Sequence, residues 1–186
     1  LGERRKLIDP ANVTAGDVVL GLASTGFHSN GYSLLRKVLE MSDRGLDEPL
    51  PGSEETFADV LLRPTRIYVR SVLGVLDAGT PIHAMAHITG GGMAGNLARV
   101  IPDGLCARLD FAEWTVPAPF RTIQQLGVVP EAEMFKTFNM GIGLVLVVPA
   151  AVAAEASAAL RAAGEEVVKL GEVIAGEPRV TLEGVA

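Results

Sequence analysis

The stretch "GLASTGFHSNGYSLLRK", residues 21–37, predicts a strand, a turn and a helix in direct succession. Residues 17–23 form a mostly apolar run closed by small polar residues, which is typical of a buried strand. Apolar residues then recur at helical spacing over 32–39, and Ser29 or Asn30 is suited to cap the start of that helix. The turn between strand and helix therefore holds more small hydrogen-bonding groups than a chain reversal needs.

The rest of the chain alternates short helices and strands. We expect further helices over 57–61, 69–76, 93–100, 120–126, 131–138 and 150–163. We expect further strands over 83–89, 105–111, 141–148, 167–174 and 179–182. Because neighbouring strands are not always separated by one helix, a mixed sheet covered by helices fits this order better than a doubly wound sheet. The predicted fold class is α+β.

The composition limits the class of protein. The chain has 186 residues, of which 48% are hydrophobic, so we expect a single domain over 1–186 with a sizeable core. Its 22 acidic and 16 basic residues give a net charge of −6, without any block of Lys or Arg. A protein that binds the phosphate backbone of nucleic acids needs a basic surface. Nucleic acid is therefore not expected as a partner.

Cysteine content and hydropathy bear on the cellular compartment and on the kinds of site that the chain can hold. Cys106 is the one cysteine, which excludes an internal disulfide and any metal site built from several cysteines, and it favours a reducing compartment. The longest apolar run, 142–154, is interrupted by Gly143 and Pro149 and is too short to span a bilayer. The first residues lack an initiator Met and an apolar signal core, so we expect the chain to begin inside a longer protein.

A second stretch, "HITGGGMAGN" at residues 87–96, places three successive glycines between a predicted strand and a predicted helix. Such glycines adopt positive φ and turn their amides toward one concavity, and the start of a helix favours an anion. A phosphate group is one expected occupant. The alternative is a turn that needs glycine only for steric reasons.

The same stretch also satisfies a dinucleotide-binding pattern. Gly90, Gly92 and Gly95 match G-x-G-x-x-G, and Asp110 follows at about the offset of a ribose-binding acid. Against this, Pro102 ends the helix after a few turns, and no second mononucleotide-binding half is evident. A nicotinamide-dependent oxidoreductase therefore stays only as an alternative.

The first stretch carries the same anion-binding logic. Its hydroxyl and amide groups are followed by the positive end of a helix, and its glycines add backbone freedom. The alternative is a polar turn with more helix-capping groups than it needs. Two such turns in one domain favour a phosphorylated ligand. His28 could donate to a phosphate or shuttle a proton, because its reference pKa of ~6.5 makes both forms accessible, or it could be an ordinary loop residue.

Other candidate residues give weaker evidence for a functional site. His83 and His87 share one face of a predicted strand, but no third ligand lies near them in sequence, so no metal site is expected. Asn139, in "KTFNMGIG" at 136–143, either presents its amide to a ligand or occupies a left-handed helix cap. Neither Ser24 nor Ser29 lies in a G-x-S-x-G pattern, so covalent catalysis has no support.

Taken together, these three stretches and "LLRPTRIYVRSVL" at 61–73 resemble the C-terminal half of the aminoimidazole ribonucleotide synthetase family, also called phosphoribosylformylglycinamidine cyclo-ligase. The resemblance covers nearly the whole chain. It implies α/β/α layers around a mixed sheet. It also implies an ATP-dependent ring closure, in purine biosynthesis, that turns formylglycinamidine ribonucleotide into aminoimidazole ribonucleotide.

The resemblance also implies a set of site residues. His28 and Asn30 carry over as catalytic, and no metal ligand does. The substrate-binding residues are Ser24, Thr25, Gly26, Ser29, Thr89, Gly90, Gly91, Gly92 and Asn139. Which turn takes the substrate phosphate stays open.

In the family, ATP and its Mg ion are held by an N-terminal domain that this chain lacks. We therefore expect a cytoplasmic fragment that is inactive alone and binds no cofactor by itself. Its partners would be the ribonucleotide substrate, its own N-terminal domain and a second copy in the homodimeric full-length enzyme. The alternative from another class is a non-catalytic module that binds a phosphorylated metabolite.

Overall fold

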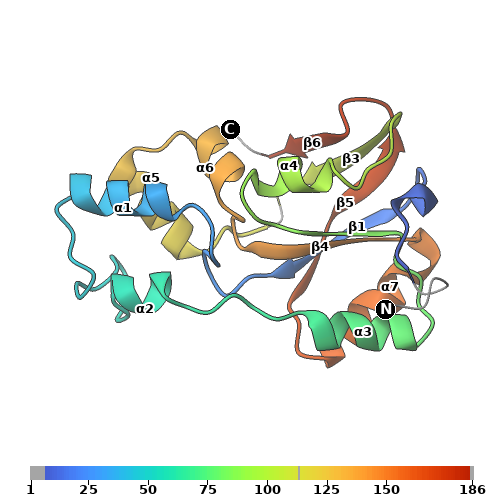
Figure 1. Ribbon diagram of the computed structural model, residues 1–186, viewed down its shortest axis with the longest axis horizontal. Helices are drawn as coiled ribbons and strands as arrows, with labels where there is room; N and C mark the ends of the chain where they lie inside the picture. Colours follow the sequence, from blue (N-terminus) through green and yellow to red (C-terminus); the bar gives the residue numbers. More distant parts are fainter. Residues whose placement is uncertain (1–6, 113, 185–186) are drawn as a thin grey trace.

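A six-stranded sheet organises the computed structural model, which describes residues 7–112 and 114–184 (Figure 1). Its strands run in the order β2-β4-β1-β5-β3-β6. All neighbours are antiparallel except β3 and β6, which are parallel, so the mixed sheet is confirmed. The strands are β1 (Val18–Ala23), β2 (Ala84–His87), β3 (Leu105–Asp110), β4 (Ile142–Val148), β5 (Val167–Ala175) and β6 (Val180–Glu183).

The helices follow the predicted order with shifted bounds. The helix expected over 150–163 is divided into a 3₁₀ turn and α7, and the one expected over 93–100 begins one residue earlier and ends three residues earlier as α4. The α-helices are α1 (Tyr32–Met41), α2 (Phe57–Leu61), α3 (Val69–Asp77), α4 (Gly92–Leu97), α5 (Ala118–Gly127), α6 (Glu131–Thr137) and α7 (Ala153–Ala162). The 3₁₀ turns are η2 (Pro10–Asn12) and η3 (Ala150–Val152).

Two separate apolar clusters cover the two faces of the sheet. Helices α1, α2, α4, α5 and α6 contribute to the first, where the ring of Phe27 lies 4.4 Å from that of Phe120 and 5.2 Å from that of Phe138. Helices α3 and α7 contribute to the second, with Val72 and Leu160 among its buried side chains. This arrangement confirms the expected α/β/α layers.

Strand β1 lies inside the sheet between β4 and β5 and serves both faces. Val19 belongs to the first cluster, whereas Val18, Leu20 and Leu22 belong to the second. Successive side chains of a strand point to opposite faces, so a strand buried on both faces has to be apolar throughout. This explains why the sequence before the polar turn reads as one unbroken apolar run.

The predicted cap of α1 is wrong. The N-cap position is Gly31, with φ 78°, and no side chain caps this helix. Ser29 and Asn30 are instead used elsewhere: the Ser29 hydroxyl lies 3.1 Å from that of Thr65, and the Asn30 side-chain oxygen accepts from the Gly90 amide. The polar groups of the turn are therefore committed to contacts between segments.

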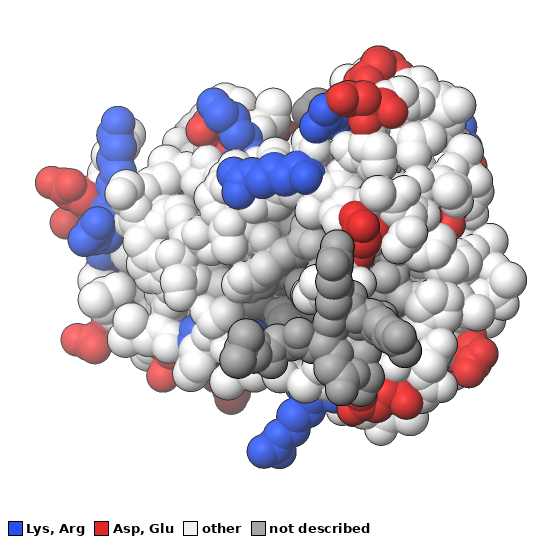
Figure 2. All heavy atoms as spheres, turned by 45° about the vertical axis from the view of Figure 1, so that its right-hand side comes forward, with Lys and Arg blue, Asp and Glu red and all other residues white. Residues whose placement is uncertain are grey.

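The charged surface agrees with the expectation from composition. On the face shown in Figure 2, Lys and Arg side chains lie scattered among acidic ones rather than in one block. Cys106 is buried as a free thiol. No helix in 7–112 or 114–184 is long and apolar enough to cross a membrane.

Candidate functional site

The two polar turns lie side by side at one edge of the sheet. We call residues 24–31 the first turn and residues 89–96 the glycine turn. The Asn30 Oδ1 atom accepts a 3.1 Å hydrogen bond from the amide of Gly90, and the rings of His28 and His87 are 6.1 Å apart. Two segments far apart in the sequence are thus joined directly.

Topology explains why these turns meet. Strands β1 and β2 both pair antiparallel with β4, one on each side of it, so they run in the same direction. Their C-terminal ends therefore lie at the same edge, where β4 begins. The loop before β4, which carries Asn139, arrives at that edge as well.

Asn139 fastens the first turn to the start of β4. Its Nδ2 donates to the carbonyl of Gly26 at 2.8 Å, and its Oδ1 accepts from the amide of Gly141 and lies 3.2 Å from the Ser24 hydroxyl. The residue is 3% exposed. The alternative of a left-handed cap is wrong, because Met140 and Gly141 take the positive φ values there. Asn139 holds this edge together from inside.

An extended segment between α2 and α3 contacts the first turn from outside. We call residues 61–68 the bracing segment. Its contacts with the first turn and the residues around it repeat along its length. They join Tyr32 Oη to the Leu61 carbonyl, Thr25 Oγ1 to the Pro64 carbonyl, Ser29 to Thr65, and Tyr68 Oη to the Ala23 carbonyl. The hydroxyl groups of the first turn thus serve mainly to position it.

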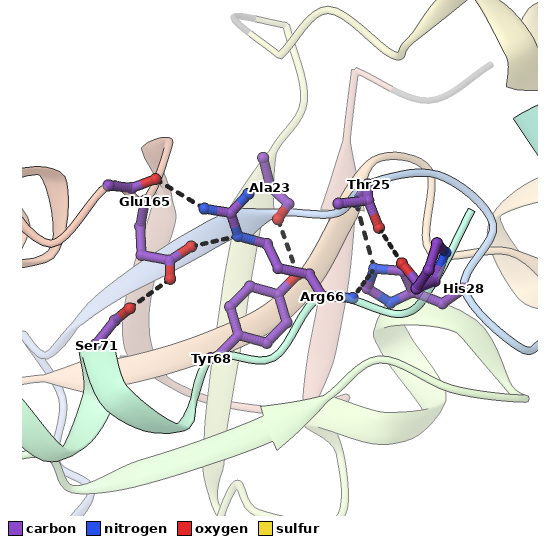
Figure 3. Close-up of polar contacts among 9 residues, drawn as sticks. Ala23, Thr25, His28, Arg66, Tyr68, Ser71 and Glu165 are labelled. Carbon is purple, nitrogen blue, oxygen red and sulfur yellow. Dashed lines mark hydrogen bonds and ion pairs between the residues drawn. The ribbon is translucent and has the colours of Figure 1, made fainter.

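His28 lies at the centre of these contacts and is not a surface residue. It is 3% exposed, and its φ is 55°. Its Nε2 accepts long hydrogen bonds from two backbone amides, those of Thr25 at 3.3 Å and Arg66 at 3.4 Å (Figure 3). Since a neutral imidazole carries one hydrogen, that hydrogen lies on Nδ1. Nδ1 is buried without a partner in the described part of the chain.

Burial, together with the neighbouring His87, lowers the pKa of His28 from 6.5 to about 4. The ring is therefore neutral at physiological pH. This removes the rationale for His28 as a proton shuttle near pH 7, and leaves it as a neutral hydrogen-bonding group.

Strand β4 packs directly against the His28 ring. A Cβ atom on Gly143 would overlap both the Tyr68 hydroxyl and the His28 ring, so only glycine permits this close approach. Burial also raises the pKa of Tyr68, which keeps its phenol protonated as the donor to Ala23.

The glycine turn is built differently. Gly90 and Gly91 are exposed, whereas Gly92 is buried with φ 63°, and a Cβ there would overlap the carbonyl oxygen of Phe135. Asn96 is buried in the centre and donates to the carbonyls of Thr89, Gly90 and Gly92. The Thr89 hydroxyl donates to Asn96 in turn. Gly90 and Gly91 are thus accessible to a ligand on the side of this turn that faces Asn30.

A hollow of about 410 Å³ opens beside the first turn, lined by His28, Ser29, Tyr32 and the 61–65 part of the bracing segment. An apolar groove of about 420 Å³ lies between α3 and β2, lined among others by Tyr68, Leu73 and Met85. His87 and Arg66 lie along this groove as well. The polar turns are therefore flanked by a small hollow and by an apolar surface.

The histidines do not form a metal centre with one another. The Nδ1 atom of His83 lies 2.7 Å from the carboxylate of Asp17 at the start of β1, whereas His87 faces His28. Within the described ranges, no group of three or more His, Cys, Asp or Glu side chains is placed to hold a metal ion.

The dinucleotide pattern is not matched by the fold. Strand β3, which ends in Asp110, is separated from β2 by β4, β1 and β5. A dinucleotide site needs those two strands to be neighbours in a parallel sheet. The carboxylate of Asp110 instead accepts from the amide of Ala112. The nicotinamide alternative is therefore wrong for this site.

Comparison with known proteins agrees with this architecture. A protein-family model described as "AIR synthase related protein, C-terminal domain" matches residues 14–183. Thiamine-monophosphate kinase from Stenotrophomonas maltophilia superposes with a TM-score of 0.65 at 15% identity, covering 98% of this chain and 55% of that chain. The hydrogenase maturation protein HypE from E. coli gives 0.62 at 18% identity, covering 96% of this chain and 49% of that chain.

A third structure, T. maritima PurL complexed with AMPPCP, gives a TM-score of 0.57 at 14% identity, over 98% of this chain and 25% of that chain. The chain spans about half the length of the first two proteins. At these identities the likeness concerns the fold.

Proposed function

The chain belongs to the AIR synthase related protein family as its C-terminal domain, and from that premise we propose that it is the substrate-holding part of an ATP-dependent enzyme. The proposed substrate is a phosphorylated ribonucleotide. The hydrogen bond between Asn30 and Gly90 carries this proposal, because it joins the two turns into one polar surface.

The exposed part of that surface suits a sugar phosphate. Ser29, Gly90 and Gly91 are exposed and Asn30 is half-buried. The Ser29 hydroxyl, the Asn30 side-chain amide and the Gly91 backbone supply polar groups without a fixed positive charge, and groups held in place lower the cost of orienting a flexible ligand. Neutral His28 lies behind them. We assign binding to these groups, and positioning to Ser24, Thr25, Thr89 and Asn139.

Within the family, we propose the cyclo-ligase reaction on formylglycinamidine ribonucleotide as the specific activity. That reaction activates a formyl oxygen with ATP and closes an imidazole ring. The resemblance places ATP and its Mg ion in an N-terminal domain, and within the described residues no group of three or more His, Cys, Asp or Glu side chains is placed to hold a metal ion. We therefore assign ATP to another part of the enzyme and limit this domain to holding and orienting the substrate.

An exposed apolar surface supports a partner domain. Several large apolar side chains on the bracing segment, α3 and β2 remain strongly exposed: Leu62, Ile67, Val69, Leu73 and Met85. Contiguous apolar surface of this kind marks contact sites. We propose that the ATP-binding domain packs on this surface.

The test is ligand binding by calorimetry with the 186-residue chain. We expect formylglycinamidine ribonucleotide to bind, NAD not to bind, and Asn30→Ala to weaken the affinity about tenfold, as for the loss of one or two hydrogen bonds. Asn12→Ala, at an exposed asparagine in η2, is the control and should bind as the wild type does.

Absence of ribonucleotide binding, or equal affinity in both variants, would overturn the proposal. Binding without any cyclisation by the complete enzyme would favour the non-catalytic module instead.

A further inference from the structure

We propose that Glu165 is a positioning residue that fixes His28 through Arg66. This proposal depends on the function proposed above at one point only, namely that His28 helps to bind the ribonucleotide. Glu165 lies just beyond α7 in the chain and contacts Arg66 and Ser71 rather than His28 (Figure 3).

The carboxylate of Glu165 is buried and fully engaged. The residue is 6% exposed, its Oε2 accepts from the Arg66 Nε at 2.7 Å, and its Oε1 accepts from the Ser71 hydroxyl at 2.5 Å. A second nitrogen of Arg66 donates to the carbonyl of Gly164 at 2.7 Å. A buried carboxylate is costly without a cation beside it, so the burial of Glu165 requires Arg66 to stay in this place.

The backbone of Arg66 connects this ion pair to His28. Its side chain points to Glu165, while its amide donates to Nε2 of His28 (Figure 3). The neighbouring Ile67 is 79% exposed, so this part of the bracing segment gains little from burial. The ion pair with Glu165 is therefore a main anchor of the amide that His28 accepts.

The position of that amide decides which nitrogen of His28 carries the hydrogen. With two N–H groups directed at Nε2, only the tautomer with hydrogen on Nδ1 lets Nε2 accept from them. If Arg66 were released, one of the two donors would be lost and the alternative tautomer would become accessible. Glu165 thus selects the hydrogen-bonding state of a ring that it does not touch.

The residue after Glu165 also contacts the end of β1, which leads into the first turn. The carbonyl of Glu166 accepts from the amide of Ala23, and the carbonyl of Ala23 accepts from Tyr68. The Glu166 side chain is exposed, and the described structure gives it no hydrogen bond. Glu166 therefore provides a matched control one residue away from Glu165.

The experiment measures the His28 tautomer in the 186-residue chain by two-bond ¹⁵N–¹H correlations of its ring. Wild type and Glu166→Gln should both show hydrogen on Nδ1 alone. Glu165→Leu, which removes the acceptor but keeps an apolar volume, should show a mixture of both neutral tautomers. Glu165→Gln keeps one acceptor for Arg66, so we expect a smaller change of the same kind.

A folded Glu165→Leu chain with the wild-type ring spectrum would overturn the proposal. If that variant does not fold, Glu165→Gln decides: a His28 ¹⁵N shift beyond that of Glu166→Gln supports the proposal, and an equal shift overturns it.

Ligand affinity separates this proposal from the function itself. We expect Glu165→Leu to bind formylglycinamidine ribonucleotide about tenfold more weakly, as for a lost hydrogen bond at the site, and Glu166→Gln to bind normally. If wild type binds no ribonucleotide, the proposed function fails while the ring spectra still decide the role of Glu165. Unchanged affinity with a changed tautomer would confine Glu165 to the structure of the turn and overturn its role in binding.

Discussion

The first turn and the glycine turn end at the same place but are held in opposite ways. The first turn is fastened by side chains and carbonyls from the bracing segment, from Asn139 and from β1. The glycine turn depends on one buried side chain, Asn96, and on the close approach of Gly92 to α6. Among the described residues, the one hydrogen bond that joins the two turns is that between Asn30 and Gly90.

This difference predicts how each turn responds to damage. Where many weak contacts hold one segment, the loss of one lowers the free energy of unfolding only slightly, because the others keep the segment in place. Where one residue satisfies several buried groups, its loss leaves all of them unpaired at once. The glycine turn should therefore be the fragile half of the site.

The largest effect is expected from Gly92→Ala. The new Cβ would overlap the Phe135 carbonyl at a φ that only glycine adopts easily, so we expect the free energy of unfolding to fall by about 3 kcal/mol. Urea denaturation measures it. Gly95→Ala, in the same helix with open space around its Cβ position, is the control and should be neutral or slightly stabilising. Equal stability of the two variants would contradict the packing described here.

The next effect is that of Asn96→Ala. The carbonyls of Thr89, Gly90 and Gly92 each lose a contact with Asn96, and the contact with Gly92 is buried, so we expect a loss of about 2 kcal/mol. Amide hydrogen exchange should accelerate at Gly92, whose amide donates within this turn, and stay unchanged in β1. Slow exchange at Gly92 in the variant would show that the turn does not depend on Asn96.

The third test concerns pH and the buried ring of the first turn. The pKa of His28 is lowered to about 4 in the folded chain, so between about pH 6.5 and pH 4 only the unfolded chain takes up this proton. Stability should therefore fall as the pH falls through this window, by about 3 kcal/mol from this group. His28→Asn, which tolerates the positive φ, should lack this part of the slope. Parallel stability curves for the two proteins would show that His28 is not shielded from protons.

The smallest effects are expected where the load is shared. Ser29→Ala and Thr25→Val each remove one contact with the bracing segment, and each should lower the free energy of unfolding by about 1 kcal/mol or less. Thermal unfolding of both single variants and the double variant measures this. A loss in the double variant well above the sum would show that the contacts act as one unit rather than independently.

The sequence predicts local structure here better than it predicts contacts. The apolar run into β1 and the helical spacing of α1 both mark their elements, because burial on one or two faces imposes a period on the chain. Ser29 and Asn30 are good helix caps by type, yet the structure uses Gly31, because their side chains gain more from Thr65 and Gly90. Those partners are distant in sequence, so no local pattern reveals them.

The bracing segment shows the same limit. It is extended, partly exposed and without periodicity, so the sequence gives no reason to connect it with the first turn. The signal that was present is chemical: Pro64 ends a helix and is followed by Thr65, Arg66 and Tyr68, polar groups on a short extended run. The two turns meet because of the strand order, which depends on pairing between segments far apart in the chain.

That strand order also bears on how the molecule reaches its native state. Val18 pairs with Val148 on one side and with Glu172 on the other, so β1 acquires both neighbours from segments much further along the chain. Pairings between such remote segments carry a large loop-closure cost and slow the search for the native topology. The edge where the turns assemble therefore forms late, and a ribosome-bound chain that ends before β4 has no place for a ligand.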